Sequence, residues 1–178
     1  MIAPLIPYGI RGAIWYQGET NAFTKESGEL YRRQLPLMIR DWRSRWGQGD
    51  FPMAWVQLPF TTATRVAWPD IRESMRKSTS LPNTGMAVTI DLGEERLLHP
   101  LNKQGFAHRL ALWARAEVYD EGIPWSGPQF SESKRDGSKL VLTFTHAEGG
   151  LQAKEEELQG FEIAGADGTY LPAVASAG

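Results

Sequence analysis

Close to the start of the chain, a short apolar run ends abruptly in a cluster of small and polar residues. The run at 13–16 is followed directly by Gln17, Gly18 and Glu19, with Asn21 two positions further on. Amide side chains and backbone N–H groups are the donors that proteins use to stabilise an anionic oxygen. The spacing therefore predicts a site at the end of a strand. The alternative is a polar turn in which Gly18 only provides tight geometry.

A second polar segment follows a later apolar run and ends in a histidine. The run at 86–90 leads into Asp91, and a short loop that contains Glu95 then reaches His99. An imidazole titrates near neutral pH and so suits general-base chemistry, yet from spacing alone a lone loop histidine is more often structural. The two strand ends together offer an amide, a carboxylate and an imidazole. No serine lies in the strand-to-helix turn that a hydrolase nucleophile needs.

The pattern of apolar residues predicts strand-and-helix units that would position these two segments. Short apolar runs predict strands at 13–16, 51–58 and 86–90, and helical spacing predicts helices at 27–46, at 69–80 and from Asn102 onward. Pro36 falls inside the first helical pattern and predicts a kink or a restart there. Apolar strands that alternate with helices predict a three-layer α/β fold with a parallel sheet. Both polar segments would then meet at the carboxyl ends of the strands, where such sheets bind ligands.

Beyond Glu121 the sequence changes character. Residues 122–128 are rich in glycine and proline and read as a linker, 139–145 predicts a strand, and 160–171 predicts a hairpin. We therefore expect an α/β domain over residues 1–121, followed by a linker and the start of a β-rich unit over 122–178.

A series of motifs in this chain occurs in the same order in a known family. They are Arg11–Asn21, Tyr31–Arg33, Asp41–Arg43, Trp46–Pro52, Val56–Pro59, Ile71–Glu73, Leu81–Ala87, Ile90–Gly93 and His99–Gln104. Together they resemble the sialate O-acetylesterase family of the SGNH hydrolases, and the resemblance extends from Ile2 to Gly165. In that family the block with the catalytic serine lies upstream of a segment like Met1–Leu5. The resemblance thus implies the C-terminal part of an esterase with an SGNH-hydrolase-like fold.

The same resemblance implies roles for the second polar segment. His99 would be the general base that takes the proton from the serine hydroxyl and later passes it to the leaving alcohol. The simplest SGNH pattern places aspartate three residues before the histidine, whereas this chain has Arg96 there. Asp91 and Glu95 are therefore candidates for the carboxylate that orients His99. A dyad oriented by a backbone carbonyl is a further alternative.

For the first segment, the resemblance implies an oxyanion site. The third block of the superfamily normally reads Gly-x-Asn-Asp, whereas this chain reads Gly18-Glu19-Thr20-Asn21. Gln17 is the preferred donor, with Asn21 and a backbone amide as alternatives. Glu19 is expected to organise hydrogen bonds rather than to act as an acid catalyst. Two tryptophans flanked by loop residues, Trp68 and Trp125, are candidates to stack on a sugar ring.

Composition and charge exclude several other classes of function. The formal net charge is -2 and no segment is a Lys/Arg block, so nucleic acid is not an expected partner. The apolar residues 1–7 contain two prolines and no basic residue, which fits neither a signal peptide nor a membrane span. There is no cysteine, no cluster with metal-ligand spacing and no phosphate-binding loop, so we expect no metal and no cofactor. Only the resemblance bears on location, and it implies a periplasmic or secreted protein.

The expected function is part of a carbohydrate O-acetylesterase that hydrolyses acetyl esters of sialic acid or related sugars. Because the serine would come from an upstream segment, this chain alone is expected to be inactive. A parallel sheet without that segment would leave an apolar edge uncovered, so we expect self-association or pairing with the missing segment. The alternative is a non-catalytic carbohydrate-binding or structural remnant.

Overall fold

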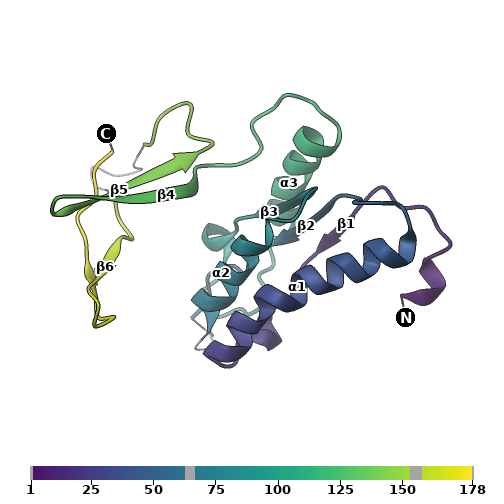
Figure 1. Cartoon of the computed structure of the whole chain (residues 1–178), viewed down its shortest axis with the longest axis horizontal. Coiled ribbons are helices and arrows are strands. Elements are labelled where there is room, and N and C mark those ends of the chain that lie inside the picture. Colours follow the sequence, from purple (N-terminus) through teal and green to yellow (C-terminus); the bar gives the residue numbers. More distant parts are fainter. Residues whose placement is uncertain (1, 63–66, 153–157, 178) are drawn as a thin grey trace. The chain divides into compact units, whose positions relative to one another are not determined.

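A computed structural model describes residues 2–62, 67–152 and 158–177 of the chain. It divides into two compact units, Met1–Ser126 and Gly127–Gly178. The first unit holds a parallel sheet with helices on both faces (Figure 1), and every candidate site residue lies in it.

The sheet of the first unit has three strands in the order β1-β2-β3. These are β1 (Ala13–Trp15), β2 (Met53–Val56) and β3 (Thr84–Ala87). All three are parallel, with Trp15 opposite Trp55 and Trp55 opposite Met86. Their carboxyl ends therefore meet at one edge of the sheet, and the predicted α/β class with a parallel sheet is confirmed.

The third strand lies two to three residues earlier than the sequence pattern predicts. It ends at Ala87, and the chain then enters a short 3-10 helix, η3 (Ile90–Leu92). Val88 and Ile90, which make the pattern look like a strand, are 40% and 44% exposed. The hydroxyl of Thr89 donates a hydrogen bond of 2.5 Å to the carbonyl of Gln57, which ties the end of this strand to β2.

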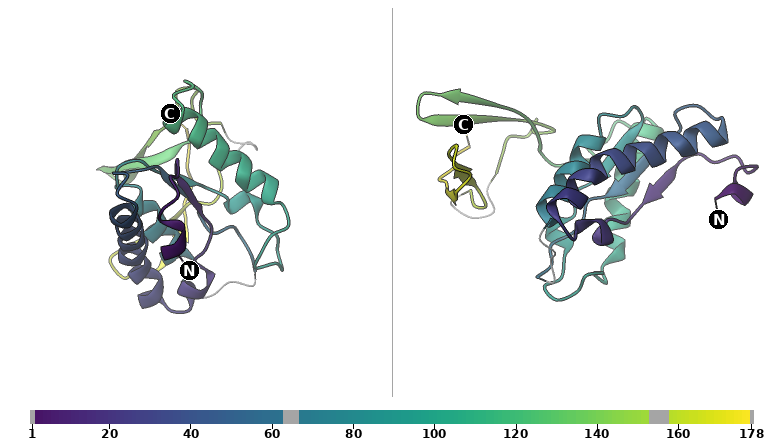
Figure 2. Two further views of the ribbon diagram at one scale, coloured as in Figure 1. Left: turned by 90° about the vertical axis from the view of Figure 1, so that its right-hand side faces the viewer. Right: turned by 60° about the horizontal axis from the view of Figure 1, so that its bottom comes forward.

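Two helices cover one face of the sheet and a third covers the other. The helices α1 (Lys25–Trp46) and α2 (Trp68–Ser78) share one buried cluster with Trp55, whereas α3 (Lys103–Trp113) shares a second cluster with Ala54 and Val56. Figure 2 shows α1 and α3 on opposite sides of the sheet. The strand residues alternate between the two clusters, as expected for a sheet that is buried on both faces.

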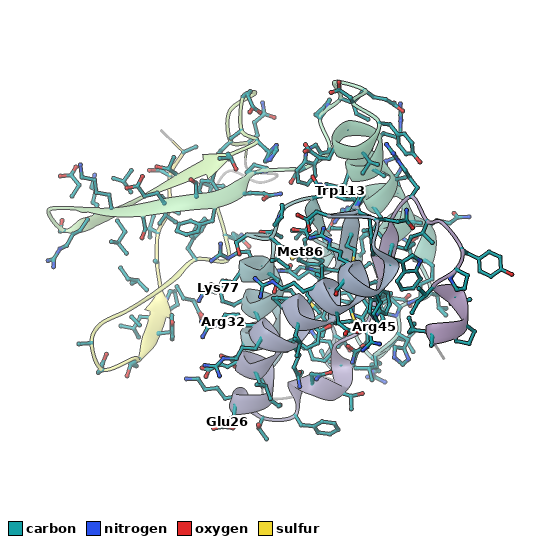
Figure 3. All side chains as sticks on the ribbon, turned by 45° about the vertical axis from the view of Figure 1, so that its right-hand side comes forward. Glu26, Arg32, Arg45, Lys77, Met86 and Trp113 are labelled. Carbon is teal, nitrogen blue, oxygen red and sulfur yellow. The ribbon has the colours of Figure 1, made fainter. Side chains whose placement is uncertain are left out.

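The ends of α1 follow from local sequence. A capping box joins Thr24 and Ser27 at its beginning, and Gly47 ends it in a left-handed conformation with φ of 63°. The helix continues through Pro36 as one element, so the restart expected there is not formed. Exposed charged side chains, among them Glu26, lie along the helix (Figure 3).

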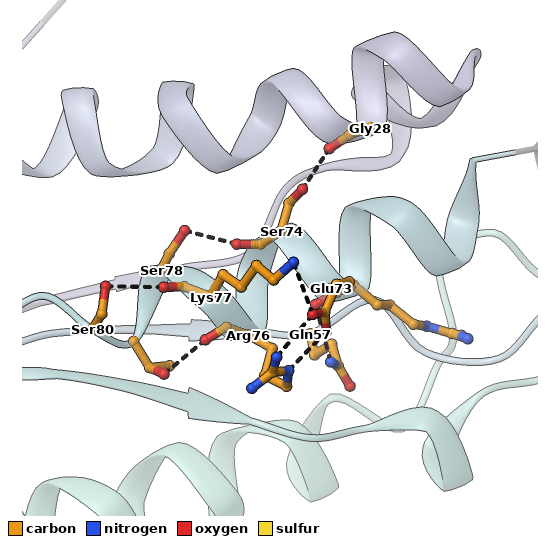
Figure 4. Close-up of polar contacts among 10 residues, drawn as sticks. Gly28, Gln57, Glu73, Ser74, Arg76, Lys77, Ser78 and Ser80 are labelled. Carbon is orange, nitrogen blue, oxygen red and sulfur yellow. Dashed lines mark hydrogen bonds and ion pairs between the residues drawn. The ribbon is translucent and has the colours of Figure 1, made fainter. Parts of the chain in front are cut away.

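Polar contacts join α2 to α1 and organise its surface (Figure 4). The hydroxyl of Ser74 donates a hydrogen bond of 2.8 Å to the carbonyl of Gly28 on α1. A side chain at Gly28 would begin 3.0 Å from the Cβ atom of Ala67, so the glycine allows the close approach of the two helices. On the outer surface, Glu73 pairs with Arg76 and Lys77.

The third helix is capped and packs tightly on the sheet. The side chain of Asn102 accepts a hydrogen bond from the backbone of Gly105, and a π-helical turn, η4 (Ala114–Val118), continues the helix beyond Trp113. A Cβ atom at Gly85 on β3 would lie 2.2 Å from the indole ring of Trp113. Only glycine therefore fits between β3 and this helix.

The second unit consists of two small antiparallel sheets. One pairs β4 (Gln129–Asp136) with β5 (Lys139–Thr145), and the other pairs β6 (Glu162–Ala164) with β7 (Tyr170–Pro172). The strand predicted at 139–145 and the hairpin predicted at 160–171 thus both form. Of the helices that the structure describes, none has the length and apolar character to span a membrane.

Candidate functional site

The first polar segment begins where β1 ends. Gly18 follows Gln17 and has a φ of 153°, and a short 3-10 helix, η2 (Glu19–Ala22), starts immediately after it. A Cβ atom at Gly18 would lie 2.8 Å from Met75 and 3.0 Å from Ile71, both in α2. The glycine lets the backbone pass directly against this helix. It thereby fixes the direction in which the following residues leave the sheet.

A chain of hydrogen bonds holds the side chain of Gln17. Trp15 Nε1 donates to the hydroxyl of Tyr31 at 3.1 Å, and that hydroxyl lies 3.1 Å from both the backbone oxygen and Oε1 of Gln17. Gln17 Nε2 donates to Asn21 Oδ1 at 2.8 Å, and Asn21 Nδ2 donates to Gln34 Oε1 at 2.9 Å. Each amide nitrogen carries two hydrogens, so both Gln17 and Asn21 have an N–H beyond those that these bonds use.

The tyrosines beside this network stay protonated over the neutral pH range. Burial raises the pKa of Tyr31 to about 12, and the charge of Glu19 acts in the same direction. Burial also raises the pKa of Tyr16 to about 12, again with a smaller contribution from Glu19. Tyr31 can therefore donate to Gln17 at any pH at which the protein is expected to work.

Glu19 and His99 bring the two predicted segments together. His99 Nε2 lies 3.6 Å from Glu19 Oε1, a distance at which a charged imidazole and a carboxylate form an ion pair. The side chain of Glu19 is only 14% exposed, whereas that of His99 is 71% exposed. The histidine thus stands at the surface and is contacted by a carboxylate that is largely shielded from water.

The structure gives Asp91 a strong partner on α3. Arg109 donates two hydrogen bonds of 2.6 Å to the two carboxylate oxygens, and it also donates one of 2.5 Å to the carbonyl of Val88. The pKa of Arg109 is raised, chiefly by its hydrogen bonds to Asp91. Asp91 therefore clamps the beginning of the His99 loop to α3, and its predicted role as the orienting carboxylate stays a prediction.

Two further acidic residues fix the middle of the same loop. The backbone carbonyl of Glu95 accepts hydrogen bonds from the hydroxyl of Thr61 at 3.2 Å and from the backbone N–H and hydroxyl of Thr62. Glu94 Oε1 accepts a hydrogen bond of 2.5 Å from the backbone N–H of Leu101. The contacts of Thr61 and Thr62 hold the loop against the segment that follows β2, whereas the contact of Glu94 joins two parts of the loop to each other. The role predicted for the carboxylate of Glu95 stays a prediction.

Some features near the site have no clear signal in the sequence. Arg72 turns inward and donates hydrogen bonds of 2.7 Å to the carbonyls of Leu58 and Pro59, and burial lowers its pKa. Trp68 donates to the same Pro59 carbonyl and is only 2% exposed. Its predicted stacking on a sugar ring is therefore wrong, because the ring lies in the core. The loop residues on both sides of Trp68 gave no hint of this burial.

Several serine hydroxyls of the first unit serve helix structure. The hydroxyls of Ser27, Ser74, Ser78 and Ser80 donate, in that order, to the carbonyls of Thr24, which caps α1, of Gly28 in α1, and of Ser74 and Lys77 in α2. Within the described residues, His, Asp and Glu side chains form no group of three or more that could bind a metal ion. The chemistry available here is thus that of an imidazole, carboxylates and amide donors.

Three comparisons with known proteins each find carbohydrate or sialate acetylesterases. A family model described as a carbohydrate esterase, sialic acid-specific acetylesterase, matches residues 4–111. Curated relatives include the sialate O-acetylesterases of Mus musculus and Homo sapiens, which are 33% and 31% identical over 92% of this chain. A solved structure, XAC1771 from Xanthomonas citri, described as a novel carbohydrate acetylesterase, superposes with a TM-score of 0.93 at 44% identity over 99% of this chain.

These relatives are much longer than the present sequence. The chain spans 34% of the mouse protein, 35% of the human protein and 42% of XAC1771. The matched family region contains both polar segments, the whole parallel sheet and most of α3.

Proposed function

The chain belongs to the carbohydrate esterase family of sialic acid-specific acetylesterases, and on this premise we propose that it forms part of an enzyme that hydrolyses acetyl esters of sialic acid or related sugars. The observation that carries the proposal is the 3.6 Å approach of His99 to Glu19. It joins a basic group to the segment that holds the amide donors, at the carboxyl ends of parallel strands.

His99 acts as the general base in this proposal. It takes the proton from a serine hydroxyl as the oxygen attacks the acetyl carbonyl, and it then protonates the sugar alcohol as that alcohol leaves. Water, activated by the same imidazole, hydrolyses the acetyl-serine and releases acetate. In this proposal the serine comes from a segment outside this sequence, as the family resemblance implies, and the hydroxyls of Ser27, Ser74 and Ser78 in the first unit bond backbone carbonyls.

Gln17 and Asn21 supply the oxyanion donors. Their side chains are held by the bonds to Tyr31 and Gln34, and the remaining amide N–H groups are free of those bonds. Donors that are fixed before the reaction stabilise the developing negative charge without a cost of reorganisation. Gly18 adds the tight turn that brings these groups to the end of β1, and a backbone N–H of this turn is a further donor.

The test compares this chain with the longer protein that contains it. We expect the chain alone to hydrolyse p-nitrophenyl acetate no faster than a background protein, because a base and oxyanion donors without a nucleophile retain little activity. The longer protein should show saturable hydrolysis that a serine-directed phosphonate abolishes.

Two results would contradict the proposal in different ways. Saturable, phosphonate-sensitive hydrolysis by the chain alone would mean that the nucleophile lies within it. A longer protein that binds acetylated sugars without releasing acetate would favour the second candidate, a non-catalytic carbohydrate-binding module.

A further inference from the structure

Four carboxylates lie in the two segments that meet at His99, and the structure gives them different partners. They belong to Glu19, Asp91, Glu94 and Glu95. Asp91 binds both of its oxygens to Arg109, and Glu94 accepts the N–H of Leu101. Glu19 alone has a described ion-pair contact with the histidine.

The side chain of Glu19 is largely shielded from water, which strengthens the electrostatic effect of its charge on neighbouring groups. Its side chain is 14% exposed, compared with 57% for Asp91, so water screens it much less. Its negative charge also contributes to the raised pKa of Tyr16 and of Tyr31. A carboxylate that water screens so little acts more strongly on a group in contact with it than an exposed carboxylate does.

The backbone at Glu19 is held firmly. It is the first residue of η2, and the N–H of Asn21 donates a hydrogen bond of 2.9 Å to the carbonyl of Gly18 just before it. Gly18 in turn packs against Met75 and Ile71 in the core. A side chain on such a rigid support can orient an exposed partner, whereas His99 in its surface loop would otherwise sample several rotamers.

We propose that Glu19 is the positioning carboxylate of His99, a role that rests on the proposed function. It holds the Nε2 side of the imidazole, so the neutral ring carries its hydrogen on Nε2 and keeps the lone pair on Nδ1. The serine proton moves to Nδ1, and the resulting imidazolium is balanced by the carboxylate 3.6 Å from Nε2. Apo distances of this kind commonly shorten in the complex with substrate.

The first experiment measures steady-state kinetics of the longer enzyme. Glu19→Gln should lower kcat by ~10²- to 10⁴-fold with little change in KM, because orientation of the base matters mainly in the transition state. Glu19→Asp, which keeps the charge, should recover part of the loss. Glu29→Gln is the matched control, since it removes an exposed carboxylate of α1 that lies outside the site.

A kcat of Glu19→Gln within about twofold of the wild type would overturn the proposal. The same holds if Glu95→Gln or Asp91→Asn causes the loss of kcat while Glu19→Gln does not. An equal loss in Glu19→Asp and Glu19→Gln would show that packing, and not charge, is what the position contributes.

A second experiment uses this chain alone and does not depend on activity. Long-range ¹H–¹⁵N correlation spectra at alkaline pH report which nitrogen of His99 carries the hydrogen. Glu19→Ala should lower the fraction with hydrogen on Nε2, and Glu29→Ala should leave it unchanged. If the fraction of His99 with hydrogen on Nε2 is unchanged in Glu19→Ala, the positioning role of Glu19 is wrong, but the proposed function is not affected. A longer protein without any esterase activity would end the proposed function, whatever the spectra show.

Discussion

At the residue scale, the candidate site combines one exposed base with several fixed partners. His99 is 71% exposed and its described ion-pair contact is with Glu19, whereas Gln17 and Asn21 belong to a chain of hydrogen bonds that ends in the core at Trp15. This division fits the different tasks that we propose. A base must reach and release protons, and oxyanion donors must be in place before charge develops.

Replacement of His99 by alanine should separate catalysis from stability. We expect turnover of the longer enzyme to fall by several orders of magnitude, because the other two histidines, His108 on α3 and His146 after β5, do not follow a strand of the parallel sheet. The melting temperature should hardly change, since the side chain is mostly exposed. His108→Ala on α3 is the control and should leave both quantities unchanged. If His99→Ala keeps most of its activity, the base is another group and the site must be reassigned.

The buried hydroxyl of Tyr31 should make stability depend on alkaline pH. Its folded-state pKa of about 12 lies above the usual value of 10.0, so the folded state keeps this proton after the unfolded state has lost it. The free energy of unfolding should therefore fall as the pH rises from 10 to 12. Urea denaturation at several pH values should show a shallower fall for Tyr31→Phe than for the wild type. An identical slope would mean that Tyr31 does not cause the effect.

The sequence predicted that the two polar segments would meet, whereas the roles of their residues stay predictions. Parallel strands place residues 17–21 and the loop up to His99 at one edge of the sheet, and the structure brings Glu19 and His99 within 3.6 Å. The choice of partner was not predictable, because it depends on contacts distant in sequence. Arg109 engages Asp91 and Thr61 binds the Glu95 carbonyl, and spacing within the loop reveals neither.

At the element scale, the sequence predicted the three strands and the three α-helices of the first unit, but it placed some of their ends wrongly and did not predict the short 3-10 helices η2 and η3 or the π-helical turn η4. Apolar residues at helical spacing predicted a helix at 27–46, and the structure has α1 at Lys25–Trp46 with Gly47 as its C-cap. The third strand was placed too late because an apolar run does not distinguish a strand from a partly exposed turn at Val88 and Ile90. The predicted fold class depends on the order of the elements and not on their limits, whereas the family resemblance depends on the sequence motifs.

Arg43 on α1 should be the most important polar side chain for holding this helix to the sheet. It is 6% exposed and donates to the carbonyls of Phe51, Pro82 and Asn83, which precede β2 and β3. Arg43→Ala should lower the free energy of unfolding by about 2–4 kcal/mol, since it removes both guanidinium hydrogen bonds to the carbonyl of the buried residue Phe51 together with those to Pro82 and Asn83.

The matched control lies two residues further along the same helix. Arg45 is exposed, and its ion pair within the described residues is with Asp41 in the preceding turn, so Arg45→Ala should change stability little. Urea denaturation of both variants measures the difference. Equal effects of the two substitutions would show that the carbonyls near Arg43 find other donors.

At the scale of the whole molecule, β1 and β3 are the two edge strands of the sheet, and β1 is the one that carries a largely exposed apolar residue. Among the described residues no strand pairs with the outer edge of β1, and Ile14 on that strand is 72% exposed. Unpaired backbone groups beside an apolar side chain favour association with another strand. We expect this edge to receive the segment with the serine in the longer protein, and to cause self-association when the chain is studied alone.

Sedimentation at several concentrations tests this expectation. The chain alone should form concentration-dependent oligomers, and Ile14→Lys should shift it toward monomer, because a charged residue on an edge strand opposes pairing. Leu37→Lys, which changes an equally apolar and exposed residue on α1, should leave the association unchanged. A chain that stays monomeric at every concentration would contradict the role of this edge.

The contact between Gly85 and Trp113 has a consequence for how this family can diverge. Because the indole ring occupies the space that any side chain at position 85 would need, neither position can change freely without the other. A larger residue at position 85 would require a smaller residue in place of Trp113. Otherwise α3, which carries Arg109, would have to move, and the hydrogen bonds of Arg109 to Asp91 would weaken. The two positions should therefore covary in an alignment of acetylesterases, because a change at Gly85 alone would disturb the helix whose Arg109 holds the beginning of the His99 loop.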